Sequence, residues 1–297
     1  MTTAAPPVPL SGILCAAQEK TVQELTGAAI VVGKKPAGLN DCTQLDSGPV
    51  AGSDPAMKGA HLATDSSPTL ALVHTSPTLA PMFAALCRQH LPEARFFHMV
   101  DESLIQNTIQ SGGLRKLTMR RLLDQIASAE AAGADAVLVT CSSIGPGVTL
   151  ARAFFDIPVL RIDEAMAEAA VEFSRIGVLA TLRTTLDPTT ALLREKAAQA
   201  GRDVELVECL CADAFPALLA GDTETHDRIL RKALLDDLTG VDVIVLAQAS
   251  MARVVATLPP GSLGVPVLSS PELAILHARK ALALPALESR IQDRTAV

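Results

Sequence analysis

The sequence predicts an α/β protein built from two pseudo-symmetric lobes, each a parallel sheet with flanking helices. From Thr69 onward, short apolar strands alternate with helical segments, which is the order that produces βαβ units. A shift of 107 residues superimposes the first half of this region on the second half. A repeat of this length is too long for a solenoid and long enough for a small lobe with its own core.

The composition excludes several classes of function. The chain has 297 residues, of which 49% are hydrophobic and 19% charged, as in ordinary globular proteins. The net charge of -7 and the absence of Trp and Tyr disfavour nucleic acid as a partner, because such binders present basic faces and stacking aromatics. No apolar run is long enough to span a bilayer and no signal peptide is evident, so we expect a cytoplasmic protein with no membrane partner.

The predicted domain organisation has three parts. Residues 1–67 are rich in Pro, Gly, Ala, Ser, Thr and Asp and show no sustained period, so we expect a weakly ordered extension. Residues 68–174 and the C-terminal segment 265–297 are expected to form the first lobe, and residues 175–264 the second. The expected elements before the central turn are strand 70–73, helix 81–90, strand 96–100, helix 117–132 capped by Gly133, and strand 136–140.

The repeat continues through the second lobe. The segment Gly133-Ala-Asp135 falls on Gly240-Val-Asp242, and the strand after it falls on residues 243–247. The segment 158–160 matches 266–268 at a shift of 108. This alignment puts the turn at Cys141 in the place that Gln248 holds in the second lobe.

The candidate site lies where the strands end. Ligands of open α/β sheets bind just past the carboxyl ends of strands. In two lobes related by a pseudo-twofold axis, the carboxyl ends of equivalent strands would face each other across a cleft. Hydroxyls beside backbone N–H groups suit a carboxylate or a developing oxyanion without a cation, although each one also suits a helix cap. The expected substrate-binding residues are Thr75, Ser76, Ser142, Ser143, Thr181, Gln248 and Ser250.

Cys141 is the expected catalytic residue. If its turn leads into a helix, the helix N-terminus and the neighbouring hydroxyls lower the pKa of the thiol, which can then act as a base or an acid. The six cysteines show no metal-ligand spacing, so we expect no metal, and the others are expected to be reduced, mostly buried thiols. Cys209-Leu-Cys211 within a strand would point both thiols to one face.

The strand and turn Val137-Leu-Val-Thr-Cys141-Ser-Ser143, together with the duplicated lobes, resemble the aspartate/glutamate racemase superfamily. This superfamily includes hydantoin racemases, maleate isomerases and arylmalonate decarboxylases. The resemblance covers about residues 69–282. It implies a cofactor-independent racemase or isomerase for a small carboxylic acid or amino acid derivative, in which thiols from the two lobes exchange the α-proton. Cys141-Ser-Ser143 matches the first thiol motif of that family.

The second thiol motif is where the sequence departs from the family. Gln248 stands at the position of the second cysteine, and an amide neither ionises nor usefully donates a proton. His74, at the end of the first strand, is the best placed substitute, and Cys209 and Asp101 are further candidates. One thiol is enough for a decarboxylase that protonates an enediolate, or for addition to a double bond as in a maleate isomerase. A non-catalytic small-acid-binding protein is the remaining alternative.

Two further expectations concern surroundings and assembly. His226 and Asp227 are expected on an exposed helix, and Arg161, Asp163 and Glu164 either line the cleft or begin a helix. The expected partner is a small carboxylate-containing substrate, with a homodimer as the common default for soluble oligomers.

Overall fold

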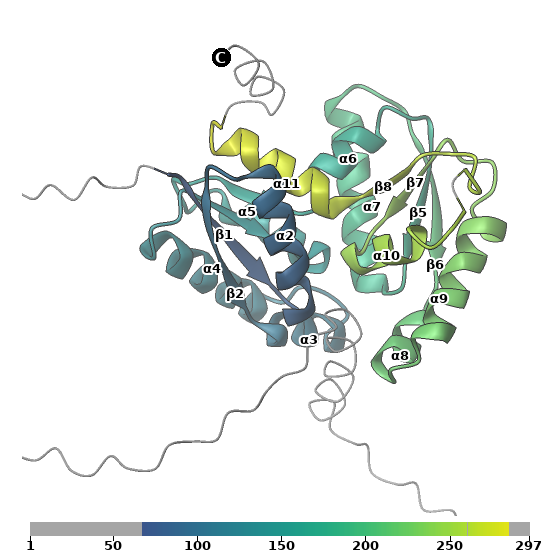
Figure 1. Cartoon of the computed structure of the whole chain (residues 1–297), viewed down its shortest axis with the longest axis horizontal. Helices are drawn as coiled ribbons and strands as arrows, with labels where there is room; N and C mark the ends of the chain where they lie inside the picture. Colours follow the sequence, from purple (N-terminus) through teal and green to yellow (C-terminus); the bar gives the residue numbers. More distant parts are fainter. Residues whose placement is uncertain (1–66, 260, 285–297) are drawn as a thin grey trace, which may run out of the picture.

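Two four-stranded parallel sheets form the core of the described part of the chain (Figure 1). The computed structural model describes residues 67–259 and 261–284, so the expected extension 1–67 lies almost entirely outside the described residues. The first sheet has the order β2-β1-β3-β4 and the second the order β6-β5-β7-β8. The strands are β1 (Thr69–His74), β2 (Arg95–Val100), β3 (Ala136–Val139), β4 (Val159–Arg161), β5 (Arg175–Ala180), β6 (Glu205–Leu210), β7 (Val243–Leu246) and β8 (Val267–Ser269).

The predicted α/β architecture of two lobes is confirmed. Central strands β1, β3, β5 and β7 are almost entirely buried, as expected of apolar strands covered on both faces. The helices are α2 (Ala80–His90), α3 (Glu102–Gln110), α4 (Lys116–Ala131), α5 (Gly145–Ala151), α6 (Glu164–Ala170), α7 (Arg183–Gln199), α8 (Ala214–Leu219), α9 (Thr223–Lys232), α10 (Ala252–Val255) and α11 (Ser270–Ala281). Gly133 follows α4 with φ of 85°, the left-handed conformation of a helix C-cap.

The sequence offset between equivalent strands of the two lobes is not the same for every pair. β7 follows β3 by 107 residues, whereas β5 follows β1 by 106. The carboxylates of Asp135 and Asp242 fix this pairing, since they accept from the backbone N–H groups of Thr69 and Arg175 respectively. The gapless shift of 107 is therefore one residue too long for the first strand. In the corrected register, Thr181 corresponds to Thr75 rather than to His74.

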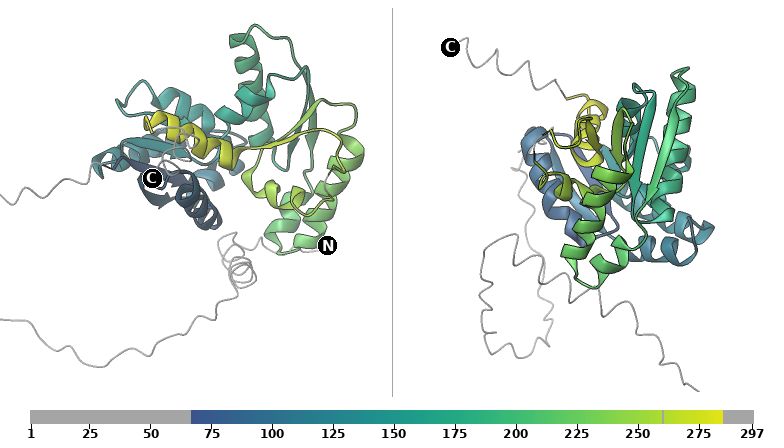
Figure 2. Two further views of the ribbon diagram at one scale, coloured as in Figure 1. Left: turned by 45° about the horizontal axis from the view of Figure 1, so that its top comes forward. Right: turned by 90° about the vertical axis from the view of Figure 1, so that its right-hand side faces the viewer.

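The two lobes exchange a helix. α6 follows a strand of the first sheet, but Met166, Ala167 and Ala170 pack in the core of the second lobe. α11 follows a strand of the second sheet, but Ala274 and Ile275 pack in a core cluster of the first lobe, against which this yellow helix lies in Figure 2. The two exchanged helices pack against each other (Figure 1).

The exchange changes the expected division of the chain. Segments 164–170 and 267–269 were both assigned to the first lobe, whereas α6 packs on the second lobe and β8 pairs with β7. α11 does belong with the first lobe, as expected for the C-terminal segment. Within the described ranges, no helix is long and apolar enough to cross a membrane.

Candidate active site at the lobe interface

Cys141 follows β3 after Thr140 and is the N-cap of a single turn of 3-10 helix, Ser142–Ile144, that leads into α5. The Thr75 hydroxyl and the backbone N–H groups of Ser143 and Ile144 hydrogen-bond its sulfur. Burial raises the pKa of the thiol, and these hydrogen bonds only partly oppose that rise. The expectation of a lowered pKa is therefore wrong, because desolvation of the sulfur outweighs the helix terminus and the hydroxyls.

Gln248 takes the equivalent place in the second lobe. Its Oε1 accepts from the backbone N–H of Thr181 at 2.7 Å and from the Thr181 hydroxyl at 2.8 Å. A backbone N–H needs an oxygen acceptor, so this pair of bonds fixes the amide with Oε1 toward Thr181. The Nε2 group has no hydrogen-bond partner among the described residues, and the side chain is only partly buried. Gln248 thus keeps two N–H donors for a ligand.

The two lobes repeat one local arrangement with different chemistry. In each, a threonine that follows the first strand bonds the residue that follows the third strand: Thr75 bonds Cys141, and Thr181 bonds Gln248. Both threonines are buried. The first lobe therefore presents a thiol and the second a neutral amide, as the sequence alignment predicts.

The turns after β3 and β7 both lie at the interface between the lobes. The hydroxyls of Ser143 and Thr185, both buried, hydrogen-bond each other across this interface at 2.8 Å. Ala249, next to Gln248, packs against the core cluster of the first lobe that contains Leu70 and Phe83. Each turn thus contacts the opposite lobe, which brings the two sets of polar side chains to a shared edge.

The remaining predicted ligands differ in exposure. Ser142 is buried, Ser76 is partly buried and bonds the Thr78 hydroxyl at 2.8 Å, and Ser250 is exposed. The Ser143 hydroxyl contacts the Thr185 hydroxyl of the opposite lobe and also hydrogen-bonds the Cys141 sulfur. The polar group of the candidate site therefore consists of two contacting sets, Cys141 with Thr75 and Ser143 in the first lobe and Gln248 with Thr181 in the second.

His74 is fully buried beneath this group. Its Nδ1 contacts the Thr140 hydroxyl at 2.8 Å and its Nε2 contacts His98 Nδ1 at 2.8 Å, while the Thr140 hydroxyl also contacts the Val73 carbonyl at 3.2 Å. One proton assignment satisfies all three: Thr140 donates to the carbonyl, His74 Nδ1 donates to Thr140, and His98 donates to His74 Nε2. Both ring nitrogens of His74 are then occupied. Burial, and secondarily the charge of His98, lowers its pKa to about 4.

A buried ion pair supports the turn that carries Cys141. Arg161, at the end of β4, bonds Asp163 at 3.0 and 2.9 Å, and both side chains are buried. A Cβ on Gly145 would lie 2.7 Å from the Arg161 guanidinium, so only glycine fits there without displacement. Because Asp163 neutralises the guanidinium, the groups at this turn that could bind an anion are hydroxyl and backbone N–H donors. The sequence shows Arg161 and Asp163 after a strand but gives no sign of their contact with Gly145.

The expectation of an exposed helix at His226 and Asp227 is wrong. Both residues are buried on α9, where Arg253 of α10 bonds the Asp227 carboxylate at 2.8 and 2.6 Å. His226 Nδ1 contacts the same carboxylate at 2.8 Å. Asp101, another candidate acid, caps α3 and pairs with Arg121 at 2.6 Å, so its carboxylate is engaged.

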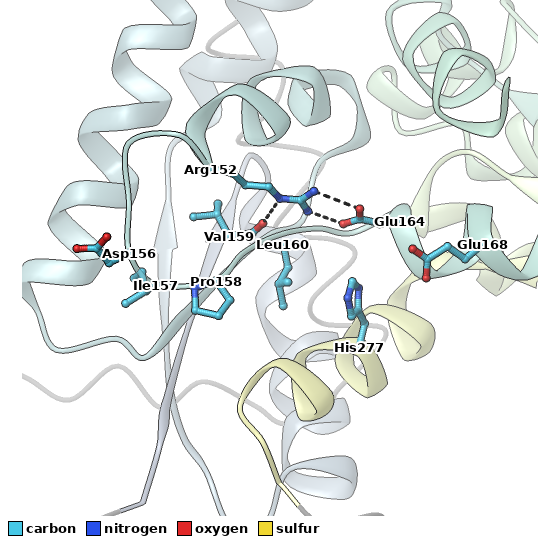
Figure 3. Close-up of a pocket in the computed structure, with 9 residues that line it drawn as sticks. All are labelled: Arg152, Asp156, Ile157, Pro158, Val159, Leu160, Glu164, Glu168 and His277. Carbon is cyan, nitrogen blue, oxygen red and sulfur yellow. Dashed lines mark hydrogen bonds and ion pairs between the residues drawn. The ribbon is translucent and has the colours of Figure 1, made fainter. Parts of the chain in front are cut away.

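A surface hollow of about 420 Å³ lies away from this group, on the β4 side of the first lobe (Figure 3). Figure 3 shows Arg152 bonded to Glu164 and to the Val159 carbonyl, which occupies its guanidinium. None of the predicted site residues lines this hollow. Across residues 67–259 and 261–284, no three His, Cys, Asp or Glu side chains are grouped to hold a metal ion.

Fold and site together define a two-lobed α/β protein with a partly buried thiol and a neutral amide on equivalent turns at the lobe interface. A family model described as Asp/Glu/Hydantoin racemase matches residues 70–278. The chain therefore belongs to the Asp/Glu/Hydantoin racemase family, as the sequence resemblance implies. A comparison with curated proteins gives no match.

Three solved structures with a similar fold are described as racemases. Aspartate racemase from Picrophilus torridus is similar at a TM-score of 0.59 and 13% identity, over 75% of this chain and 97% of that chain. Allantoin racemase from Klebsiella pneumoniae is similar at a TM-score of 0.51 and 20% identity, over 73% and 89%. Glutamate racemase RacE1 from Bacillus anthracis is similar at a TM-score of 0.55 and 16% identity, over 73% and 82%.

Proposed function

We propose that this protein is a cofactor-independent racemase or isomerase of a small carboxylic acid or amino acid derivative, with the Cys141 thiol as its proton-transfer group. The observation that carries the proposal is the position of Cys141. Its thiol follows a central strand of a racemase-family fold and lies among the Thr75 hydroxyl and two backbone N–H groups. The same donors that hold the sulfur stabilise the thiolate, which is the form that removes the α-proton from the substrate and becomes the neutral thiol as it does so.

Substrate oxygens are expected at the neutral donors around Cys141. The Gln248 Nε2 group supplies two N–H donors from the second lobe, and the exposed Ser250 hydroxyl follows it on the same turn. A carboxylate or enediolate held by such donors keeps its charge without a buried cation. This donor set recognises carboxylates in general, which fits a small acid as the substrate class.

A decarboxylase that protonates an enediolate from one face is the second candidate. Gln248 at the place of a second thiol favours it, since only Cys141 can then deliver a proton. The raised pKa of Cys141 points the same way, because a thiol that is protonated at neutral pH is ready to act as an acid. In this reaction the substrate loses carbon dioxide and the enediolate carbon takes the proton from sulfur.

Proton NMR in D2O tests both candidates. A panel of small amino acids, hydantoins, maleate and substituted malonates is incubated with wild type, Cys141→Ala and Cys87→Ala. Cys87 is a fully buried cysteine on α2 of the same lobe and is the matched control. We expect α-proton exchange or a new isomer with wild type and Cys87→Ala, and a loss of at least about a hundredfold in rate with Cys141→Ala, the usual size of an acid–base contribution.

The other outcomes separate the alternatives. Loss of a carboxylate with one deuterium gained, again dependent on Cys141, selects the decarboxylase. If no substrate changes, and wild type and Cys141→Ala bind the same acids equally well, the catalytic proposal fails and a small-acid-binding protein takes its place. Turnover that survives in Cys141→Ala would move the proton-transfer role to another residue.

A further inference from the structure

A pair of cysteines lies on the second lobe outside the proposed active site. Cys209 lies on β6 opposite Leu179 of β5, and Cys211 follows the strand directly. β6 is an edge strand of its sheet. Alternate residues of a strand point to the same side, and both cysteines contact the same apolar cluster. Cys211 is 9% exposed within this cluster, whereas Cys209 is less buried at its margin.

The two thiols contact each other. A hydrogen bond between the sulfurs lowers the pKa of Cys209, and the same bond raises that of Cys211. Burial and the Asp237 carboxylate oppose this lowering of the Cys209 pKa, and the Lys232 ammonium on α9, itself paired with Asp237 at 2.6 Å, favours the thiolate to a smaller extent. Cys209 is thus the more reactive sulfur, and Cys211 is the thiol held next to it.

We propose that Cys209 and Cys211 form a reversible dithiol–disulfide pair that small hydroperoxides oxidise. The Cys209 thiolate attacks one peroxide oxygen, the O–O bond breaks, and a sulfenic acid forms as hydroxide leaves and is protonated to water. The Cys211 sulfur then attacks the sulfenic sulfur, the S–O bond breaks, and a second water leaves with the thiol proton. The cysteines lose two electrons and hydrogen peroxide gains them.

Backbone geometry makes such a bond labile. Two residues of extended strand span about 6.7 Å, close to the upper limit of about 6.8 Å between the Cα atoms of a disulfide. Closing the bond therefore bends the end of β6, and a strained disulfide has a more oxidising potential that mild thiols can reverse. Cys211 lies one residue beyond the strand, and its backbone N–H still donates to the Ala180 carbonyl at 2.7 Å, so closing the disulfide also strains this hydrogen bond.

A mass measurement on the full chain tests the proposal without any assay of turnover. Trypsin releases one peptide, residues 203–228, that contains both cysteines and no internal Lys or Arg. After brief treatment with hydrogen peroxide and alkylation, we expect this peptide to be two hydrogen atoms lighter and to carry no alkyl group. A dithiol reductant should restore both alkylation sites. Cys87 is fully buried with a pKa raised to about 12, so we expect it to react at least about tenfold more slowly.

Single variants identify the order of the steps. In Cys211→Ala, the sulfenic acid on Cys209 has no partner and should be trapped by dimedone. In Cys209→Ala, the peptide should keep a freely alkylated Cys211 under the same treatment. The proposal is overturned if wild type carries dimedone on Cys209 as heavily as Cys211→Ala does, or if Cys209 reacts no faster than Cys87. Because the readout is mass, these outcomes do not depend on whether Cys141 is catalytic.

Discussion

His74 shows how a single buried side chain ties stability to pH. Folding holds its imidazole neutral, with a pKa of about 4 against an ordinary value of 6.5. Between these two values the unfolded chain binds a proton that the folded chain does not, so stability falls as pH falls through this window and is fully present above about pH 6.5. The shift corresponds to about 3 kcal/mol between pH 7 and pH 4.

We expect substitution of His74 to reduce this pH dependence. His74→Asn keeps an N–H donor for Thr140 and removes the titrating ring. The free energy of unfolding, measured in urea between pH 4 and 7, should fall less steeply for His74→Asn than for wild type, so that the two curves converge at low pH. Parallel curves for the two proteins would show that His74 does not titrate in this range.

At the scale of elements, the turn after β3 and the start of helix α5 pack together against the Arg161–Asp163 ion pair. Gly145 begins α5 under the buried Arg161 guanidinium, which two bonds to Asp163 hold in place. Gly147, two residues later, instead faces the tips of Leu122 and Met119. An added methyl group at Gly145 therefore meets a fixed group, whereas one at Gly147 meets flexible side-chain ends.

We expect Gly145→Ala to cost about 1–3 kcal/mol of stability and to lower the rate of the Cys141 reaction, because the displaced turn moves the sulfur. Gly147→Ala is the matched control in the same helix and should cost less in both measurements. Thermal unfolding and the NMR exchange rate report the two effects. An equal loss in both variants would mean that the guanidinium moves aside freely.

The strands and helices were easier to predict from the sequence than the contacts between side chains that are distant in sequence. Apolar runs at 70–73 and 136–140 predicted buried strands, and Gly133 predicted a helix end, because these signals are local. Helix α3 was missed, since Glu102–Gln110 is short and mostly polar. Cys141 was placed correctly after its strand, but its thiol environment depends on Thr75, which is distant in sequence. A desolvation effect of this kind cannot be inferred from spacing alone.

At the scale of the whole molecule, the exchange of α6 and α11 makes the lobes dependent on each other. The sequence predicted the similarity of the lobes but not the exchange, because an amphipathic helix does not specify which of two similar sheets it covers. Without the C-terminal segment, the core of the first lobe is not covered by α11. Without the segment before β5, the core of the second lobe is not covered by α6.

We expect a chain divided at Phe173 to give two fragments that do not fold separately. Fragment 67–173 loses the α11 side chains that fill its core, and fragment 174–284 loses those of α6. Circular dichroism and size-exclusion chromatography of each fragment alone, and of an equimolar mixture, measure the outcome. A cooperative unfolding transition for either fragment alone would contradict the mutual dependence, whereas folding on mixing would support it.

The helix exchange also bears on how the chain is made. Leu70 and Ile275 belong to one core cluster, so β1, the first strand in the described part of the chain, is fully covered only when nearly the whole chain has been synthesised. Until then, the first sheet exposes an apolar face on which a chaperone or a second nascent chain can bind. Contacts between residues so far apart in sequence also slow folding. Helix α11, the last in the described part of the chain, therefore completes the first lobe, which is prone to aggregation until α11 has been synthesised.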